Sequence, residues 1–271
     1  MADSTASQVK HSAAAQGAGR VGMACFGFVH LVLAYLAVRV ALGGGGGQAA
    51  DQKGALAEIG STSFGQVVLW GLAAGLLAFG LWQFMMAAIG YSWVGKKGKR
   101  IRKRIGSGAR GVVVIGLGIS AVQLVLGSGS SSGDQKQQEF TAKLLAQPAG
   151  QVLVAVAAAA VLGVAIASGV KGFTKEFLED LDTGELPAGT QRWVTRLGMA
   201  GYLAKGAVLA VVAVLLAFAA LSADARQAGG LDKALRTMAA QPFGAVLLVV
   251  VALGLAAFGV YCFAAARAHK T

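Results

Sequence analysis

A stretch that occurs three times in related form constrains this chain more than any other feature. Each copy begins with a polar lead that contains an aspartate, continues through a glycine, and ends in a long apolar run. The three copies align on Gly65, Gly150 and Gly244. A repeat of this length indicates that one structural unit is used three times, which has to be recognised before any fold is assigned.

The apolar character of the chain places it in a lipid bilayer. Of its 271 residues, 56% are hydrophobic and only 13% are charged, against about 25% charged residues in an ordinary soluble domain. The mean hydropathy is +0.65. Crossing the hydrocarbon layer takes about 20 apolar residues. Six runs meet that length: 21–42, 64–90, 108–127, 148–170, 197–221 and 242–266.

The distribution of charge predicts the orientation of these spans. All 12 acidic residues lie outside the six runs. About 17 of the 24 Lys and Arg residues lie in the two termini and in the connections after the second and fourth spans, when Arg110 and Lys205 at the starts of two spans are included. By the positive-inside rule, both termini and those two connections face the cytoplasm. We expect a multi-pass protein of a bacterial plasma membrane.

The spans group into helix pairs, each with a helix that starts inside, an outer connection and a returning helix. We therefore expect an all-α, six-helix bundle of three two-helix repeats around a pseudo-threefold axis normal to the membrane. Short amphipathic helices are expected in the outer connections. The predicted segments are a disordered tail at 1–19, repeats at 20–91, 108–170 and 196–267, a basic linker at 92–107 and an amphipathic linker at 171–195.

The net charge of +12 is concentrated beside the second and third spans. A juxtamembrane basic cluster of this size is typical of a contact with anionic lipid headgroups, each charge contributing about 1 kcal/mol near the surface. No aromatic residue is interleaved for base stacking, so nucleic acid is not an expected partner. The expected lipid-contacting residues are Lys96, Lys97, Lys99, Arg100, Arg102, Lys103 and Arg104.

A few polar residues within the spans are candidates for an intramembrane site. His30 is the only histidine within a span, so neither a bis-histidine haem nor a metal site is expected, and no cofactor is predicted. For each candidate, interhelical hydrogen bonding or snorkelling to the interface is the plain alternative. The candidates are His30, Arg39, Gln83, Gln123 and Lys205.

Small residues within the spans predict close helix packing. Glycine lets two helix backbones approach, which favours a compact bundle over a wide lumen. The residues expected at such contacts are Gly71, Gly75, Gly80, Gly254 and Gly259. In the linker 171–195, Phe173, Phe177, Leu178 and Leu181 form an apolar stripe, which predicts either an interfacial helix or a docking site for a cytoplasmic partner.

Three motifs recur with the repeat. The first and fifth spans both open with Arg-x-Gly-Met-Ala, and two of the outer leads begin with Asp-Gln-Lys. The third span opens with Arg110-Gly111, parallel to Lys205-Gly206 in the fifth. The last returning helix starts Gln241-Pro-Phe-Gly, whereas the second copy has Ala149 in place of the phenylalanine.

Together these motifs resemble a bacterial, largely actinobacterial, membrane family known only as domain of unknown function 1206. The resemblance covers nearly the whole chain after residue 19 as three tandem copies. It implies the six-span topology. It brings no catalytic residues, because the activity of that family is itself unassigned.

Two functions remain open from the sequence. The first is a non-enzymatic scaffold or accessory protein that binds lipids or a membrane or cytoplasmic protein partner. The second is a channel or transporter for an anion or other small solute, with its pathway along the pseudo-threefold axis. No nucleophile with a base, phosphate loop or carboxylate pair is recognisable, so an enzyme is not expected.

Overall fold

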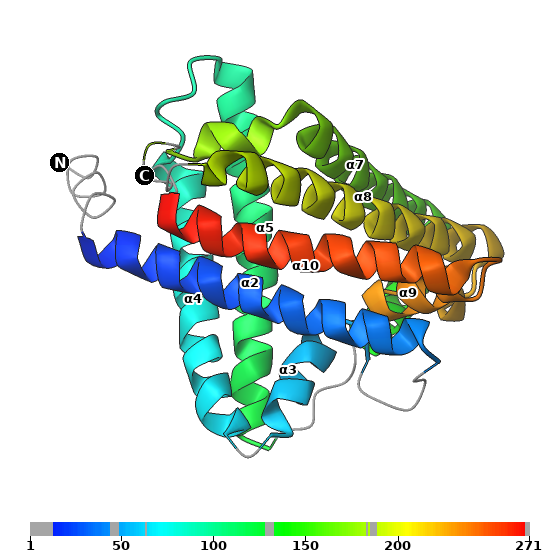
Figure 1. Ribbon diagram of the computed structural model, residues 1–271. Helices are drawn as coiled ribbons and strands as arrows, with labels where there is room; N and C mark the ends of the chain where they lie inside the picture. The colour runs from blue at the N-terminus through cyan, green and yellow to red at the C-terminus, as the bar shows by residue number, and fades with distance from the viewer. Residues whose placement is uncertain are drawn as a thin grey trace.

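The computed structural model describes residues 13–43, 49–62, 64–127, 133–182, 184 and 189–268, and the regular elements in these ranges are all helices (Figure 1). The all-α class predicted from the sequence is confirmed. Residues 1–12 of the predicted tail lie outside the described part, whereas residues 13–19 already belong to the first long helix.

Six helices are long and apolar enough to cross a membrane, which makes the chain a multi-pass membrane protein. Three of them, the first, third and fifth, start well before the predicted spans. Lysine and arginine are good helix formers, so the basic segment continues the third long helix back to Lys97. The helices are α2 (Ala13–Ala41), α4 (Gly65–Ile89), α5 (Lys97–Val125), α7 (Gly150–Thr174), α8 (Thr190–Ser222) and α10 (Gly244–Ala268).

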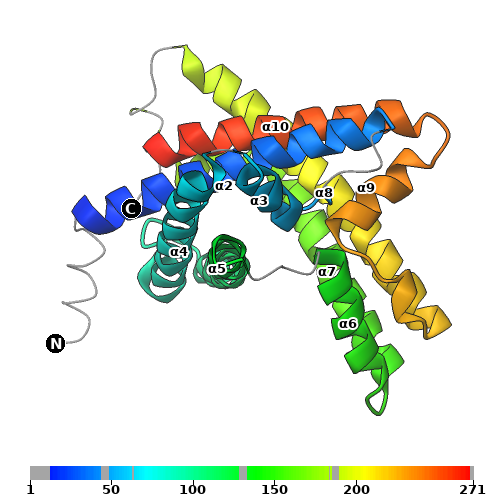
Figure 2. The ribbon, with the colours of Figure 1, turned by 90° about the horizontal axis from the view of Figure 1, so that it is seen from below.

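The most extensive helix contacts join consecutive repeats rather than the two helices of one repeat. They pair α4 with α5, α7 with α8, and α10 with α2, so the last repeat closes back on the first (Figures 1 and 2). The three pairs converge near the two chain ends and diverge away from them. We call the first side the terminus end and the opposite side the short-helix end.

The three repeats close into a ring, but the contacts between the two helices of one repeat differ among the repeats. Within their repeats, α2 packs on α4 and α8 on α10, whereas α5 and α7 share at most a marginal contact over their described lengths. Accordingly, α7 is the least buried of the six long helices. The pseudo-threefold axis predicted from the sequence therefore stays a prediction.

The three aligned glycines mark the same tight turn before each returning helix. The backbone N–H of Gly65, Gly150 and Gly244 donates to the carbonyl three residues earlier, at 2.8, 2.9 and 2.7 Å. A Cβ at these glycines would lie 2.1 to 2.4 Å from a carbonyl oxygen of the preceding short helix, so a side chain cannot be accommodated there without a shift. Pro148 and Pro242 lie in this turn, before the first residue of the returning helix.

Each outer connection contains a short helix: α3 (Gln52–Gly60), α6 (Gly133–Leu145) and α9 (Leu231–Ala239). A 3-10 turn, η3 (Ala225–Gln227), precedes the last of them. Leu56 and Leu235 are fully buried, so α3 and α9 pack on the bundle. Only α6 keeps a large aromatic side chain, Phe140, exposed.

Three aspartates join the starts of these short helices across the repeats; we call Asp51, Asp134 and Asp232 the aspartate clasp. Asp51 caps α3 by accepting from the N–H of Gly54 at 2.6 Å, and it also accepts from Gly133 of the next repeat at 2.8 Å. Asp134 in turn accepts from the backbone N–H groups of Gly230 and Lys233 in the third repeat.

The third aspartate completes the circle, since Asp232 accepts from the N–H of Ala50 in the first repeat at 2.7 Å. Its other oxygen accepts from Arg236 at 2.9 Å. Each repeat thus supplies a carboxylate to the outer connection of the next. This hydrogen-bonded circle ties together connections that are far apart in the sequence.

Most of the glycines expected at helix contacts lie at close crossings. A Cβ at Gly75 would meet the Sγ of Cys25 on α2, and one at Gly259 would meet the carbonyl of Gly27 on the same helix. Gly80 faces α5 and Gly254 faces α8 in the same way. Gly71 differs, because a Cβ there would meet nothing within 4 Å.

Candidate functional site

A small cavity of about 40 Å³ lies at the terminus end, and we call it the chamber. Each of the six long helices contributes at least one residue to its wall. Six of its lining side chains are aromatic: Phe26, Phe79, Tyr91, Tyr202, Phe258 and Tyr261. A water molecule needs at least about 10 to 15 Å³ of such space, so the chamber has room for a few waters or one small ion.

Three cations meet at this chamber. Arg110 of α5 and Lys171 of α7 line it directly. Lys205 of α8 extends along its aromatic wall, with Nζ 4.0 Å from the ring centre of Phe258 and 5.7 Å from that of Phe26. Such cation–π contacts partly compensate a buried ammonium group. The site is therefore strongly positive within a largely apolar setting.

Asp180 is the one carboxylate among the described residues that line the chamber. Its Oδ2 lies 3.7 Å from Nζ of Lys171, and its Oδ1 lies 2.6 Å from Nζ of Lys103. Asp180 is thus shared between two lysines. For the guanidinium of Arg110, the described part of the chain provides neither a hydrogen bond nor an ion pair within the distance limits for these contacts.

Toward the short-helix end, the chamber is closed by an aromatic plug formed by Phe26, Phe79, Phe258 and His30. The ring of Phe26 lies 5.8 Å from Phe79 and 6.4 Å from Phe258, and the His30 ring lies 4.4 and 4.9 Å from Phe26 and Phe258. Past the plug, buried leucine side chains continue the apolar packing. Among them are Leu33, Leu36, Leu76 and Leu248.

One ring nitrogen of His30, the histidine in the plug, forms a hydrogen bond within its own helix. Nδ1 of His30 lies 2.9 Å from the carbonyl oxygen of Phe26, one helical turn earlier. A carbonyl oxygen only accepts hydrogen bonds, so Nδ1 carries the proton and donates it. The ring meets Phe26 at an interplanar angle of 63° and Phe258 at 56°, and these edge-on and tilted contacts suit a packed residue.

A 3-10 helix, η1 (Glu176–Asp180), covers the chamber at the terminus end. The helix α7 stops at Lys175, which adopts a left-handed backbone conformation with φ of 57°. Phe177 then turns inward and is completely buried between Tyr202 and Tyr261, with ring centres 5.4 and 5.2 Å away. It fits because residue 198 is glycine: a Cβ there would lie 2.4 Å from the ring.

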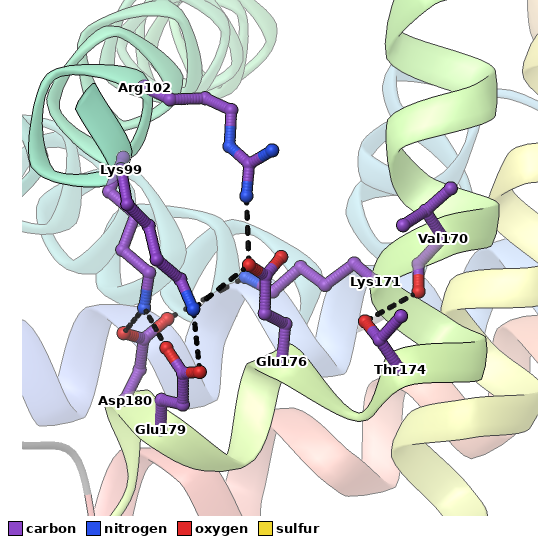
Figure 3. A network of polar contacts seen from close by, with 9 residues as sticks. Lys99, Arg102, Val170, Lys171, Thr174, Glu176, Glu179 and Asp180 are labelled. Atoms are coloured by element: carbon purple, nitrogen blue, oxygen red, sulfur yellow. Dashed lines mark hydrogen bonds and ion pairs between the residues drawn. The ribbon is translucent and has the colours of Figure 1, made fainter. Parts of the chain in front are cut away.

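Ion pairs hold the acidic face of η1 to the start of α5 (Figure 3). Lys99 pairs with Glu179 at 2.7 Å and with Glu176 at 3.2 Å. Arg102 pairs with Glu176 at 2.8 Å. The hydrogen bond from Lys99, with help from Lys103, lowers the pKa of Glu179. The segment expected to form an interfacial helix therefore folds back onto its own chain, although Phe173 remains exposed.

The five polar residues predicted within the spans are only partly brought together. His30 and Lys205 meet around Phe26 and Phe258. Gln83 is buried, and its Oε1 has no hydrogen-bond partner in the described part of the chain. Arg39 lies at the short-helix end, where it pairs with Glu58 at 3.2 Å. Gln123 is exposed.

Much of the basic cluster predicted to contact lipid is engaged within the protein. Besides the cations bound to η1, Arg100 donates to the carbonyl of Val94 at 2.7 Å and Arg104 to that of Gly90 at 3.2 Å. Lys96 and Lys97 at the start of α5 are exposed. Their charged groups are therefore exposed on the surface of the protein.

Sequence reasoning missed several residues of the chamber, above all Arg110, Lys171, Asp180 and Tyr261. A signal for one of them was present, because Arg110 occupies the same repeat position as Lys205. Equivalent positions on equivalent helices are expected to approach a common axis. No comparable signal marks Lys171, whose counterparts in the other copies are Met86 and Ala265.

The matches to a known protein family agree with the three repeats. The family model described as Domain of Unknown Function (DUF1206) matches at residues 21–90, 105–175 and 200–269. The uncharacterized protein YxxB of Bacillus subtilis (strain 168) is 30% identical over 243 residues, which cover 90% of this chain and 87% of that protein. No solved structure matches. The chain therefore belongs to the DUF1206 family, as three tandem copies of its domain.

Proposed function

We propose that this protein is a non-enzymatic membrane protein that acts by binding a ligand in the chamber, and that it does not conduct solutes. The observation that carries the proposal is the closed end of the chamber. The aromatic plug and the leucines past it leave the polar groups of the chamber on one side of an apolar seal. A site that is sealed toward one end of the bundle is suited to binding.

The proposal includes the orientation of the protein. We place the terminus end in the cytoplasm of a bacterial cell, with the protein in the plasma membrane. The basic residues at the start of α5 support this, since positively charged segments are retained on the cytoplasmic side. In this orientation Lys96 and Lys97 contact anionic headgroups, and the chamber receives its ligand from the cytoplasm or from a membrane or cytoplasmic protein partner.

The test is a flux measurement on the purified protein in liposomes that enclose a chloride-sensitive or phosphate-sensitive reporter. We expect the flux to equal that of protein-free liposomes. Phe258→Ala is expected to create a leak, because it removes the ring that packs against Phe26, His30 and Nζ of Lys205 in the plug. The lipid-facing Phe218→Ala is the matched control and is expected to stay tight. A specific flux through the unaltered protein would overturn the proposal.

A transporter for an anion or small solute is the second candidate, and the placement of two polar residues in the seal favours it. His30 and Lys205 lie where a moving plug would pass a solute. In that case Lys205→Leu and His30→Ala would abolish a measured flux. Arg39→Leu would leave it largely intact, because Arg39 is paired at the opposite end.

A further inference from the structure

The three cations of the chamber exceed the negative charge that the chain supplies to them. Arg110, Lys171 and Lys205 meet one carboxylate, Asp180, which is bound more closely to Lys103 than to Lys171. A buried charge without a partner is unfavourable, because its hydration is lost and not replaced. Ionisable residues at this depth in a membrane protein generally mark a functional site.

Arg110 is the chamber residue whose side chain is most clearly available to bind a ligand. Its guanidinium lines the chamber and has no hydrogen bond or ion pair to the described residues. This group presents N–H donors in a rigid plane, which matches two oxygens of one phosphate or carboxylate. A single-atom anion would use only part of that geometry.

The other groups around the chamber are also suited to an oxyanion. The ammonium of Lys171 lies over the ring of Tyr202 at 5.0 Å and faces the same space. Tyr261 is buried, and its hydroxyl has no hydrogen bond to the described residues. A hydroxyl that opens on the chamber can donate to an anion oxygen. The positive surroundings exclude a cation from the same place.

From this arrangement we propose that the chamber binds a phosphate-type oxyanion, with Arg110 and Lys171 as direct ligands and Lys205 as a supporting positive charge. The inference deepens the proposed function, on which it rests for the idea of a one-sided binding site, by naming the ligand class. The same chemistry is offered by free phosphate and by the headgroup of an anionic phospholipid. The ion reaches the chamber past η1, whose residues Asp180 and Leu181 form part of its wall.

The first arm of the test uses inorganic phosphate as the probe. The full-length protein is placed in phosphatidylcholine nanodiscs and titrated by calorimetry, with chloride at matched ionic strength as the competitor. We expect saturable phosphate binding that chloride does not displace. Hydrogen bonds to charged groups contribute about 1.5 to 3 kcal/mol, so Arg110→Gln is expected to weaken binding about 10-fold to 100-fold. Lys171→Gln is expected to weaken it in the same direction.

The second arm tests the lipid source. The protein is prepared in an equal mixture of phosphatidylcholine and phosphatidylglycerol without phosphate, and retained lipids are counted by native mass spectrometry. Retention of phosphatidylglycerol by the unaltered protein but not by Arg110→Gln assigns the site to a headgroup. Binding in the first arm alone assigns it to free phosphate. The matched control in both arms is Arg39→Gln, an arginine at the opposite end of the bundle, which is expected to bind like the unaltered protein.

Two results would overturn the inference. One is the absence of both phosphate and phosphatidylglycerol binding by the folded protein. The other is equal binding by the unaltered protein, Arg110→Gln and Lys171→Gln. If one variant fails to fold, as judged by size-exclusion chromatography, the other still decides. Oxyanion binding together with a specific flux would refute the proposed function and leave this inference standing. The absence of both binding and flux would refute this inference and leave the proposed function standing.

Discussion

Each end of the bundle holds a cluster of three like-charged side chains, and the two clusters differ in how their charges are paired. At the short-helix end, the aspartate clasp brings three carboxylates together, and every one of them accepts backbone N–H groups from another repeat. At the terminus end, the chamber brings three cations together, and Arg110 has no such partner among the described residues. The first cluster is hydrogen-bonded within the chain, and for the second we propose an external anion.

This difference separates a structural role from a functional one. A buried polar group that is hydrogen-bonded within the chain stabilises the fold, and it costs stability when the bonds are removed. A buried cation without a partner does not stabilise the fold by itself. We therefore expect substitutions in the clasp to reduce stability, and substitutions of the chamber cations to change ligand binding.

The largest expected effect concerns the packing that holds the chamber end together. Phe177→Ala removes a ring that is completely buried between Tyr202 and Tyr261. We expect a loss of about 3 to 5 kcal/mol of stability, as for other large-to-small core substitutions. Thermal unfolding in detergent measures it, with Phe173→Ala in the same segment as the control, because Phe173 is 70% exposed. Equal losses in the two variants would show that η1 is not anchored by Phe177.

The sharpest contrast between the two ends comes from a pair of single substitutions. Asp51→Ala leaves the N–H groups of Gly54 and Gly133 without their acceptor, which is expected to cost about 2 to 4 kcal/mol. Arg110→Gln in phosphate-free buffer and phosphatidylcholine is expected to be neutral or stabilising. Both are measured as shifts of the unfolding midpoint. A larger loss of stability in Arg110→Gln than in Asp51→Ala would contradict the proposed difference between the two ends.

The smallest effect is a pH dependence with opposite sign at the two ends. Burial, opposed by its backbone hydrogen bonds and reinforced by Asp232, raises the pKa of Asp51. A raised pKa means that the folded state holds the proton more tightly, so this contribution to stability is present at low pH and is lost as the pH rises through the folded pKa. The unaltered chain should therefore gain stability relative to Asp51→Asn as the pH falls from 7 towards the ordinary aspartate range.

Glu179 at the terminus end behaves in the opposite way. Its pKa is lowered by the hydrogen bond from Lys99, so its contribution is present above the ordinary glutamate pKa and is lost as the pH falls through the lowered one. The unaltered chain should lose stability relative to Glu179→Gln on acidification, and by less, because this ion pair is largely exposed. Unfolding midpoints of both variants over the same pH series provide the measurement. Slopes of the same sign would contradict the prediction.

The sequence alone predicted the elements that depend on local composition. The six long apolar runs and their threefold order follow from hydropathy and from the alignment on Gly65, Gly150 and Gly244. Those glycines proved to occupy the same turn in every copy, where a side chain would collide with a carbonyl. The parallel between Arg110 and Lys205 was also readable from the repeat. Helix propensity and bilayer thickness determine these features without reference to distant residues.

The tertiary structure decided what lies opposite each charged group. Asp51 and Gly133 belong to different repeats, as do Arg110 and Lys205, and only the cyclic pairing of the six helices brings these groups together. The same packing folded η1 inward, since the space above Gly198 admits Phe177. A sequence shows which residues carry charge. Whether a charge is paired or open to a ligand depends on distances of a few ångströms between helices, and those are set by side-chain packing across the whole bundle.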